Sequence, residues 1–211
     1  MFKAARKRDQ GKALPNQVPL LYSDAALLFF LQRKFVYIAK IYYLCGGFNR
    51  NIYCSMKITL LVVGKTTDGQ LEALISNYVK RLGHYIPFTL QVIPELKQTK
   101  SLTTEQQKVQ EGELILKAVP ASADLILLDE RGKEYTSIEF SAYIQKRMSA
   151  GRDIVFVVGG PYGFSEAVYN RAAGMISLSR MTFSHQMVRL FMVEQLYRAM
   201  TILNGEPYHH E

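Results

Sequence analysis

The stretch GRDIVFVVGGPYGFS, residues 151–165, carries the pattern that determines the fold class. Its first half, DIVFVVGG (153–160), is a short and almost wholly apolar run rich in β-branched residues, which predicts a strand buried on both faces. Its second half, GGPYGFS (159–165), places three glycines in a turn and ends at Ser165, which is positioned to cap a helix. A buried strand that leads through a turn into a helix is typical of a parallel α/β sheet.

The same alternation of strand-like and helix-like segments extends to both sides of this stretch. The predicted strands are 57–64, 88–94, 124–130, 153–160 and 175–180, and the predicted helices are 70–83, 103–119, 137–151, one beginning after Ser165, and 185–203. We therefore predict one Rossmann-like α/β domain over residues 56–211, with a mostly parallel sheet and helices on both faces. Ligands of such sheets bind beyond the carboxyl ends of the strands, so the candidate binding loops follow Leu128, Val158 and the strand 175–180.

Two helices carry further signals. Thr103 and Gln106 have the spacing of a capping box, which predicts a helix start. The helix 185–203 is apolar on most of its circumference. This apolar surface is larger than one sheet face can cover, so we expect the helix to pack on its own sheet and on a second subunit. The alternative is a central helix of a monomer. Glu194 and Arg198 lie one turn apart and can form an ion pair.

Charge and cysteine both divide the chain near Met56. Residues 1–55 hold 9 Lys and Arg against 2 Asp, a net charge of +7, whereas residues 56–211 hold 17 basic against 16 acidic residues, a net of +1. Any RNA contact of the second part must therefore come from local clusters. Cys45 and Cys54 both precede Met56, and the histidines do not have zinc-ligand spacing, so we expect no disulfide and no metal site in residues 56–211, and a cytoplasmic protein.

The first 55 residues are basic and then strongly apolar, and three interpretations compete. A membrane-spanning helix is disfavoured because Gln32, Arg33, Lys34 and Lys40 interrupt the apolar run, whereas a helix lying on a membrane surface tolerates such residues. The interpretation we favour is an N-terminal extension outside the functional domain, explained by a start codon assigned too far upstream of Met56. We expect no membrane contact of residues 56–211.

Three segments could carry chemistry. The glycine loop 159–165 allows a ligand to approach the backbone closely, although a tight turn alone also needs glycine. The segment 177–189 offers Ser and Thr side chains and backbone amides suited to adenosine, although it could simply cap the last helix from Ser184. The ending NGEPYHHE (204–211) has aromatic and imidazole groups that can stack on a base or move a proton, although chain ends are often frayed.

Taken together, these motifs resemble one family over residues 56–211. They are MKI…VVGK at 56–65, LLDERGK at 127–133, GRDIVFVVGGPYG at 151–163, LSRMTFSHQMVRLFMVEQLYRA at 178–199, and the closing GEPYHHE. In this order and spacing they are similar to the large-subunit ribosomal RNA methyltransferase H family of the SPOUT superfamily. Residues 1–55 match nothing in that family.

The resemblance implies a trefoil knot in the carboxyl-terminal part of the Rossmann-like sheet and a homodimer with each site near the subunit boundary. It implies transfer of a methyl group from S-adenosylmethionine to N3 of a pseudouridine, position 1915 of 23S rRNA, in the ribosome or large subunit. The cofactor-binding residues that it implies are Leu128, Gly159, Leu178, Ser179, Arg180, Met181, Thr182 and Phe183.

Such a transfer needs alignment and removal of the N3 proton, and neither a metal nor a covalent intermediate. His209, with Tyr208 beside it, is the first candidate for holding the base or taking the proton, and His185 is the second. Arg189 could bind phosphate or form a buried pair within the dimer. Many family members have Arg or Lys where this chain has His210, which weakens a phosphate contact there. The alternatives are a non-catalytic RNA-binding or ribosome-assembly factor of the same fold and another nucleotide-binding enzyme.

Overall fold

The computed structural model describes residues 56–96 and 101–209 of the 211-residue chain. The alternatives considered for the first 55 residues, a membrane-associated helix or an extension outside the domain, concern residues outside this range. The same is true of His210. Within the described ranges, no helix has both the length and the hydropathy needed to cross a membrane.

Five parallel strands form the sheet. They are β1 (Ile58–Val63), β2 (Phe88–Ile93), β3 (Asp124–Lys133), β4 (Ile154–Val158) and β5 (Gly174–Ile176), in the spatial order β2-β1-β4-β3-β5. Every pairing is parallel. Because all five strands run in the same direction, their carboxyl ends lie at the same edge of the sheet.

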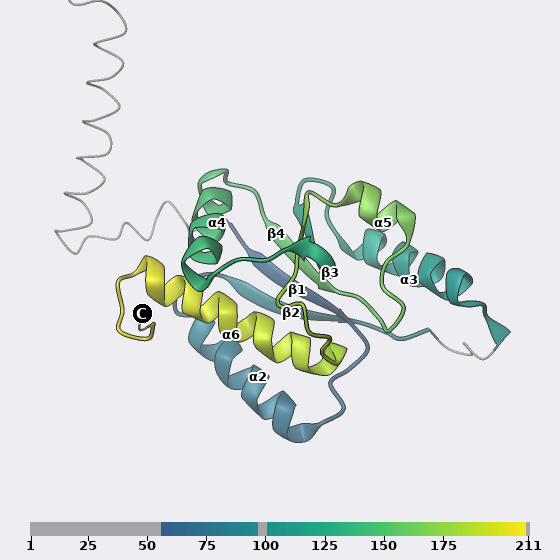
Figure 1. Cartoon of the computed structure of the whole chain (residues 1–211), viewed down its shortest axis with the longest axis horizontal. Helices are drawn as coiled ribbons and strands as arrows, with labels where there is room; N and C mark the ends of the chain where they lie inside the picture. Colours follow the sequence, from purple (N-terminus) through teal and green to yellow (C-terminus); the bar gives the residue numbers. More distant parts are fainter. Residues whose placement is uncertain (1–55, 97–100, 210–211) are drawn as a thin grey trace, which may run out of the picture. The chain divides into compact units, whose positions relative to one another are not determined.

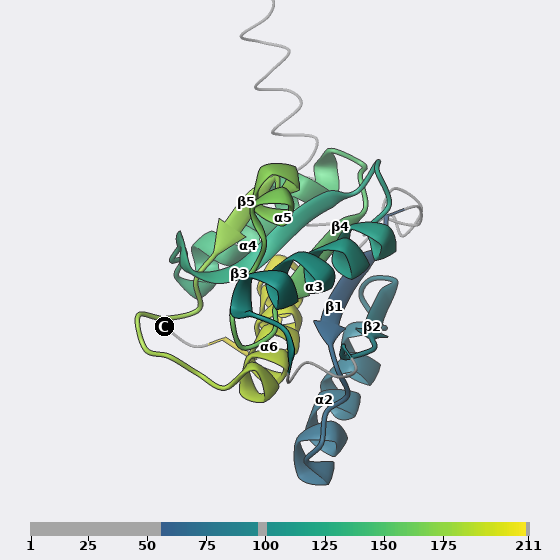
Figure 2. The same cartoon turned by 90° about the vertical axis from the view of Figure 1, so that its right-hand side faces the viewer.

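Helices cover both faces of the sheet (Figures 1 and 2). The helices are α2 (Gly69–Leu82), α3 (Thr104–Ala118), α4 (Ser137–Ser149), α5 (Glu166–Arg171) and α6 (His185–Leu203). One buried cluster joins α2, α4 and α6 to one sheet face, and a second joins α3 and α5 to the other. Helix α6 lies between α2 and α4 and contacts both.

Alternation along the central strands produces these two cores. In β1, Ile58, Leu60 and Val62 belong to the cluster under α6, whereas Leu61 and Val63 belong to the cluster under α3. Side chains in a strand point alternately to opposite faces, so a run apolar at every position is buried only when both faces are covered. The predicted α/β sheet with helices on both faces is confirmed.

The element boundaries agree closely with the prediction, with three differences. Strand β3 continues to Lys133, three residues beyond its predicted end. Strand β5 ends at Ile176, and the Ser177 amide still donates to the Lys133 carbonyl at 3.0 Å before the chain leaves the sheet. The expected cap of α5 is wrong in its chemistry, since Ser165 holds the N-cap position without a side-chain hydrogen bond. The capping box of Thr103 and Gln106 is confirmed.

Strands β3 and β5 pass very close to each other at Gly132. The pairing of β3 with β5 shifts register between Leu128 and Lys133, so the residues between them bulge out of the ladder. A Cβ added to Gly132 would lie 2.4 Å from the carbonyl carbon and 2.5 Å from the amide nitrogen of Ile176. Both are backbone atoms that cannot rotate away, so only glycine fits this crossing.

Arg189 is bonded to neutral oxygens, and among the described residues it forms no ion pair with a carboxylate. Its side chain is among the largest fully buried ones, with 1% exposure. The guanidinium donates to the carbonyls of Val63 (2.6 Å) and Gly64 (3.0 Å) and to the Thr66 hydroxyl (3.2 Å). It therefore fastens the first turns of α6 to the carboxyl end of β1, and its burial contradicts the phosphate contact that was one of the two alternatives.

We predict that Gly132→Ala destabilises the domain by about 2 kcal/mol or more, because the added methyl group forces β3 and β5 apart. Urea unfolding followed by circular dichroism measures the loss. Gly69→Ala is the matched control, since nothing lies within 4 Å of its Cβ position. A Gly132→Ala midpoint equal to that of the control would contradict the close crossing.

Candidate active site

A pocket of about 790 Å³ opens at the carboxyl edge of the sheet. Three chain segments line it: the bulge that follows Leu128 in β3, the glycine loop 159–164 after β4, and the segment 176–185 that connects β5 to α6. These are the three loops that the parallel-sheet argument selected from the sequence. The pocket therefore lies where open α/β sheets bind their ligands.

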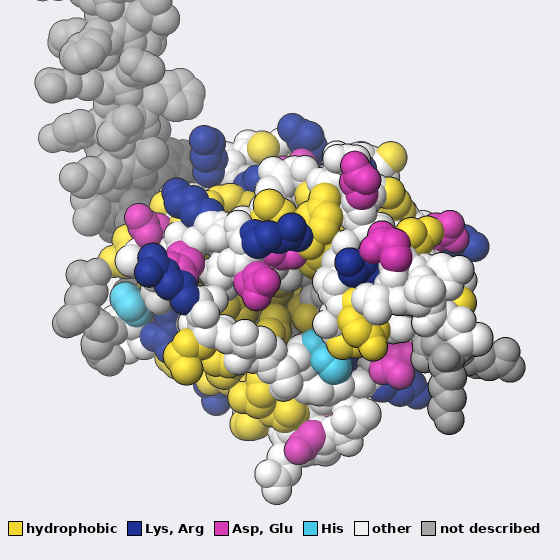
Figure 3. Space-filling view, turned by 45° about the vertical axis from the view of Figure 1, so that its right-hand side comes forward, with side chains coloured by type: hydrophobic (Ala, Val, Ile, Leu, Met, Phe, Trp, Pro, Cys, Tyr) yellow, Lys and Arg dark blue, Asp and Glu magenta, His cyan; other side chains and the backbone are white. Residues whose placement is uncertain are grey.

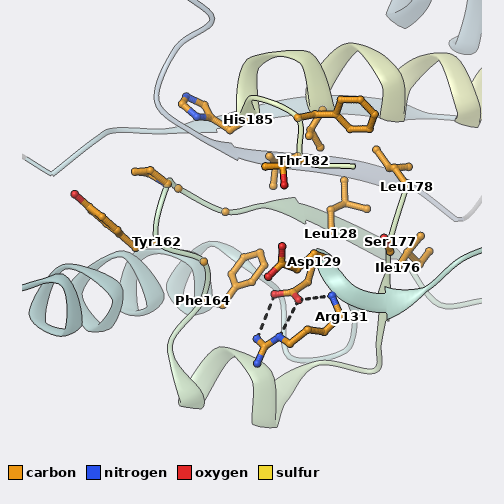
Figure 4. Close-up of a pocket in the computed structure, with 18 of the residues that line it drawn as sticks. Leu128, Asp129, Arg131, Tyr162, Phe164, Ile176, Ser177, Leu178, Thr182 and His185 are labelled. Atoms are coloured by element: carbon orange, nitrogen blue, oxygen red, sulfur yellow. Dashed lines mark hydrogen bonds and ion pairs between the residues drawn. The ribbon is translucent and has the colours of Figure 1, made fainter. Parts of the chain in front are cut away.

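Seven of the eight expected cofactor residues line this pocket, and so does the catalytic candidate His185. The seven are Leu128, Gly159, Leu178, Ser179, Met181, Thr182 and Phe183. Figure 4 shows Leu128 near the centre of the pocket, Ile176, Ser177 and Leu178 at one end, and Tyr162 and His185 at the other. The fold thus brings together residues separated by more than 50 positions.

The side chain of Arg180 does not enter the pocket. It is 91% exposed, and its Nε lies 3.3 Å from the Glu134 carboxylate. Its neighbours Ser179 and Met181 do line the pocket, so the Arg180 backbone runs along the wall while the guanidinium points away. Any contribution of Arg180 to ligand binding would come from its backbone.

Short-range hydrogen bonds shape the segment that leads into α6. The Ser177 hydroxyl donates to the Ser179 carbonyl at 2.9 Å, and the Met181 amide donates to the Ser179 hydroxyl at 3.0 Å. Ser184 then caps α6 by accepting from the Met187 amide at 3.3 Å. These local turns keep residues 178–183 out of regular structure, and five of these six residues line the pocket.

A carboxylate in the bulge of β3 organises the opposite wall. Asp129 accepts hydrogen bonds from the Tyr169 hydroxyl and from the backbone amide (2.9 Å) and Nε (3.1 Å) of Arg131. The Arg131 guanidinium also lies 4.6 Å from the centre of the Tyr169 ring, and that ring meets Phe164 edge to face. Figure 4 shows the Asp129–Arg131 pair beneath the pocket. The network joins β3, α5 and the glycine loop.

The titration of Asp129 follows from this network. Burial alone would raise the pKa of its carboxyl, but the hydrogen bonds from Arg131 and Tyr169 and the positive charge of Arg131 outweigh burial and lower the pKa. Burial and the bond to Asp129 raise the pKa of Tyr169 in turn. Asp129 is therefore an anion and Tyr169 a neutral donor near pH 7.

The lining suits a neutral heterocycle with polar edges better than a phosphate. Leu128, Ile176 and Leu178 supply apolar surface, whereas Ser177 and Thr182 supply hydroxyls. The pocket lacks the Lys-Ser/Thr pair of a phosphate-binding P-loop. Among the described residues, no group of three or more His, Cys, Asp or Glu side chains could hold a metal ion.

Tyr208 and His209 do not reach this pocket within one chain. No residue after Val188 lines it. The Tyr208 hydroxyl contacts Glu194 at 3.1 Å, and Glu194 lies 9 residues beyond His185, roughly 14 Å along the axis and on the opposite side of α6. Figure 1 shows the chain leaving α6 at the end away from the 177–184 segment.

Several pocket residues were not selected from the sequence. Asp129 and Arg131 follow directly after Leu128, and their position at a strand's carboxyl end was a usable signal. Tyr169 and Phe164 carried no such signal, because their contacts join α5 and the glycine loop to a strand about 40 residues earlier.

Comparison with known proteins gives the family. The family model described as "Predicted SPOUT methyltransferase" matches residues 56–209. A protein of Parabacteroides distasonis named "Ribosomal RNA large subunit methyltransferase H" is 60% identical over 157 residues, 74% of this chain and 100% of that protein. The chain belongs to the SPOUT methyltransferase family. The resemblance read from its motifs is thereby confirmed.

Two further matches, one in sequence and one in structure, are as follows. The protein of the same name from Christiangramia forsetii is 61% identical over 156 residues, 74% of this chain and 99% of that protein. Among solved structures, a probable methyltransferase from Bordetella pertussis Tohama I has a TM-score of 0.48 and 12% identity, over 72% of this chain and 99% of that one. The family match in this SPOUT methyltransferase begins at Met56, where the charge distribution also changes.

We predict that Tyr169→Phe costs about 1.5 to 3 kcal/mol of stability at pH 7, because Asp129 loses a hydrogen bond made to its charged form. The lowered pKa of Asp129 stabilises the fold above about pH 4, the unfolded value, and this contribution disappears as the pH falls through the folded pKa. The difference between wild type and variant should therefore shrink at low pH.

Urea unfolding at pH 7 and pH 3 measures this difference. Tyr162→Phe is the control, because Tyr162 lies on the same glycine loop with 49% exposure. A Tyr169→Phe deficit that is the same at both pH values would rule out the link to Asp129.

Proposed function

We propose that this protein transfers a methyl group from S-adenosylmethionine to N3 of the pseudouridine at position 1915 of 23S rRNA, in the ribosome or large subunit. The observation that carries the proposal is a pocket built from three strand-end loops in a chain of the SPOUT methyltransferase family. The names of its relatives support ribosomal RNA as the substrate. Such a substrate is consistent with a cytoplasmic protein.

The residues of the pocket fit S-adenosylmethionine. Leu128, Leu178 and Phe183 would cover the adenine faces, while the backbone of Gly159 and of residues 178–183 would hydrogen-bond its edges and the ribose. Gly163 has a positive φ of 79°, which lets the glycine loop turn tightly around a ligand. When bound, the sulfonium supplies an activated methyl group.

The protein's own task is then alignment and removal of one proton. The N3–H must lose its proton as the new N–C bond forms, so a neutral imidazole within hydrogen-bond reach is the suitable base. His209 is the first candidate and Tyr208 lies beside it. His185 lines the pocket and is the second candidate, in addition to its place in the first turn of α6.

The position of the tail, residues 204–209, supports a homodimer. Within one chain the tail lies across α6 from the pocket, so Tyr208 and His209 can complete a site only on a second copy. Helix α6 already packs on α2 and α4, yet Leu190 and Phe191 remain partly exposed. This apolar surface supports a contact between two copies of α6, which brings the tail of one chain to the pocket of the other.

Two further expectations belong to the same proposal. The close crossing of Gly132 and Ile176 is consistent with a trefoil knot formed by the carboxyl-terminal segment. The family match over residues 56–209 supports a functional domain that begins at Met56 and an N-terminal extension that is not needed for it.

On the face shown in Figure 3, Lys and Arg side chains are mixed with Asp and Glu side chains, so rRNA would be recognised by local contacts.

We predict that the full-length protein binds S-adenosylmethionine in isothermal titration calorimetry and binds neither NAD nor ATP. Replacing Leu178 with Asp should weaken cofactor binding at least about tenfold, since a carboxylate then lies against the adenine face. Ile138→Asp is the control, an exposed aliphatic residue on α4. Binding of NAD or ATP in place of S-adenosylmethionine would exclude the proposed cofactor.

We further predict methyl incorporation into the pseudouridine loop of 23S rRNA in ribosomes from a strain without this enzyme. His209→Ala should lose the activity and keep cofactor binding, whereas Leu178→Asp loses both. If sites combine a pocket and a tail from different chains, mixing the two inactive variants restores roughly a quarter of wild-type activity. Mass spectrometry of the digested rRNA measures the product.

The outcomes of these experiments distinguish a site shared between two chains from a site within one chain, and an enzyme from an RNA-binding factor. No activity in the mixture, despite subunit exchange, would place pocket and tail of each site on one chain. Cofactor binding by a wild-type protein that methylates no ribosomal RNA would instead indicate the alternative, an RNA-binding factor without turnover.

A further inference from the structure

The tail lies against α6 and is held there by hydrogen bonds to carbonyls of that helix. The Asn204 amide side chain donates to the Met200 carbonyl at 2.7 Å, and the Glu206 amide donates to the Thr201 carbonyl at 3.0 Å. From α2's side, the Tyr85 hydroxyl donates to the Glu206 carboxylate at 2.6 Å. Residues 204–209 therefore have a defined course beside α2 and α6.

The side chain of Tyr208 is fixed at both its ring and its hydroxyl. The hydroxyl lies 3.1 Å from the Glu194 carboxylate, to which it donates, and 3.3 Å from the Tyr78 hydroxyl. The ring meets Tyr197 edge to face at 4.8 Å, and the Arg198 guanidinium lies 4.8 Å from the ring centre. These contacts fix the orientation of the Tyr208 ring.

Glu194 is the centre of this arrangement. One of its oxygens, Oε1, also accepts from Arg198 at 2.6 Å, and Oε2 accepts from Gln195 at 2.7 Å. Its side chain is only 17% exposed. A carboxylate bonded at both oxygens has a fixed orientation, so it directs the Tyr208 hydroxyl to one position.

Tyr208 is also unsuited to take a proton. Burial, the hydrogen bond with Tyr78 and the negative charge of Glu194 all raise the pKa of its phenol. The phenol therefore stays protonated near pH 7 and acts as a donor to Glu194. The imidazole of His209 follows one residue later in the chain, so its position depends on where Tyr208 is held.

We infer that Glu194 and Tyr78 are positioning residues for methyl transfer, which hold the Tyr208 phenol and through it fix the tail that carries His209. This inference rests on the proposed function and assigns Tyr208 itself a positioning role. Glu194 and Tyr78 touch neither the pocket nor the substrate, and they act through the tail. The α2–α6 surface is thus part of the catalytic apparatus.

A double-mutant cycle on the full-length protein tests this. Tyr208→Phe and Glu194→Gln should each lower the single-turnover methylation rate about tenfold at saturating cofactor and ribosomes, since each weakens the same hydrogen bond. The double variant should show roughly the same tenfold loss and not about a hundredfold, because the two residues act as a unit. Tyr78→Phe should show a smaller loss in the same direction.

Three readouts separate positioning from a general loss of structure. The dissociation constant for S-adenosylmethionine and the shape of the pH–rate profile should stay as in wild type. Hydrogen exchange at the Glu206 and Tyr208 amides should become faster in Tyr208→Phe. Tyr135→Phe removes a phenolic hydroxyl from a ring that contacts Tyr143 and Lys133, outside the network around Tyr208, and should keep the wild-type rate.

Specific outcomes overturn the inference. An unchanged rate in Tyr208→Phe, or losses that multiply in the double variant, would show that Glu194 does not act through Tyr208. Loss of one limb of the pH–rate profile in Tyr208→Phe would make Tyr208 a proton-transfer group. A wild-type protein that binds the cofactor but labels no rRNA would instead overturn the proposed function, and the positioning role with it.

Discussion

The central strands β1, β3 and β4 are apolar on both faces, so helices must shield both faces of the sheet from water. The rest of the structure depends on this requirement. Two separate helix groups satisfy this requirement, with α2, α4 and α6 on one side and α3 and α5 on the other. Because all strands are parallel, every crossover returns to the same end of the sheet. The loops at the opposite edge are then left free to form the pocket.

Helix α6 connects the two chemically important parts of the chain. Its first turns line the pocket through His185 and Val188 and are fastened to β1 by Arg189. Its middle presents Glu194 to the tail. A buried guanidinium bonded to two carbonyls is costly to disturb, so the start of α6 stays fixed at the pocket while Glu194 contacts the tail.

Much of this arrangement could be predicted from local sequence signals. The apolar runs and the capping residues Thr103 and Ser184 located the strands and helices to within a few residues, and strand ends selected the three pocket loops. Contacts between distant segments could not be predicted in this way. No residue near Arg189 in the sequence indicates that its hydrogen-bond partners are carbonyls more than 120 residues earlier. The residues around Tyr208 likewise do not indicate that its hydroxyl donates to Glu194.

The crossing at Gly132 has a consequence for how this chain can evolve. Most surface positions accept many residues, and the pocket lining can change its chemistry by substitution. At Gly132 any side chain would strike the Ile176 backbone, so the strand that carries the pocket wall cannot be altered there by single steps. On this wall of the pocket, new specificities would therefore arise on either side of a fixed point, through residues 129–131 and 177–183.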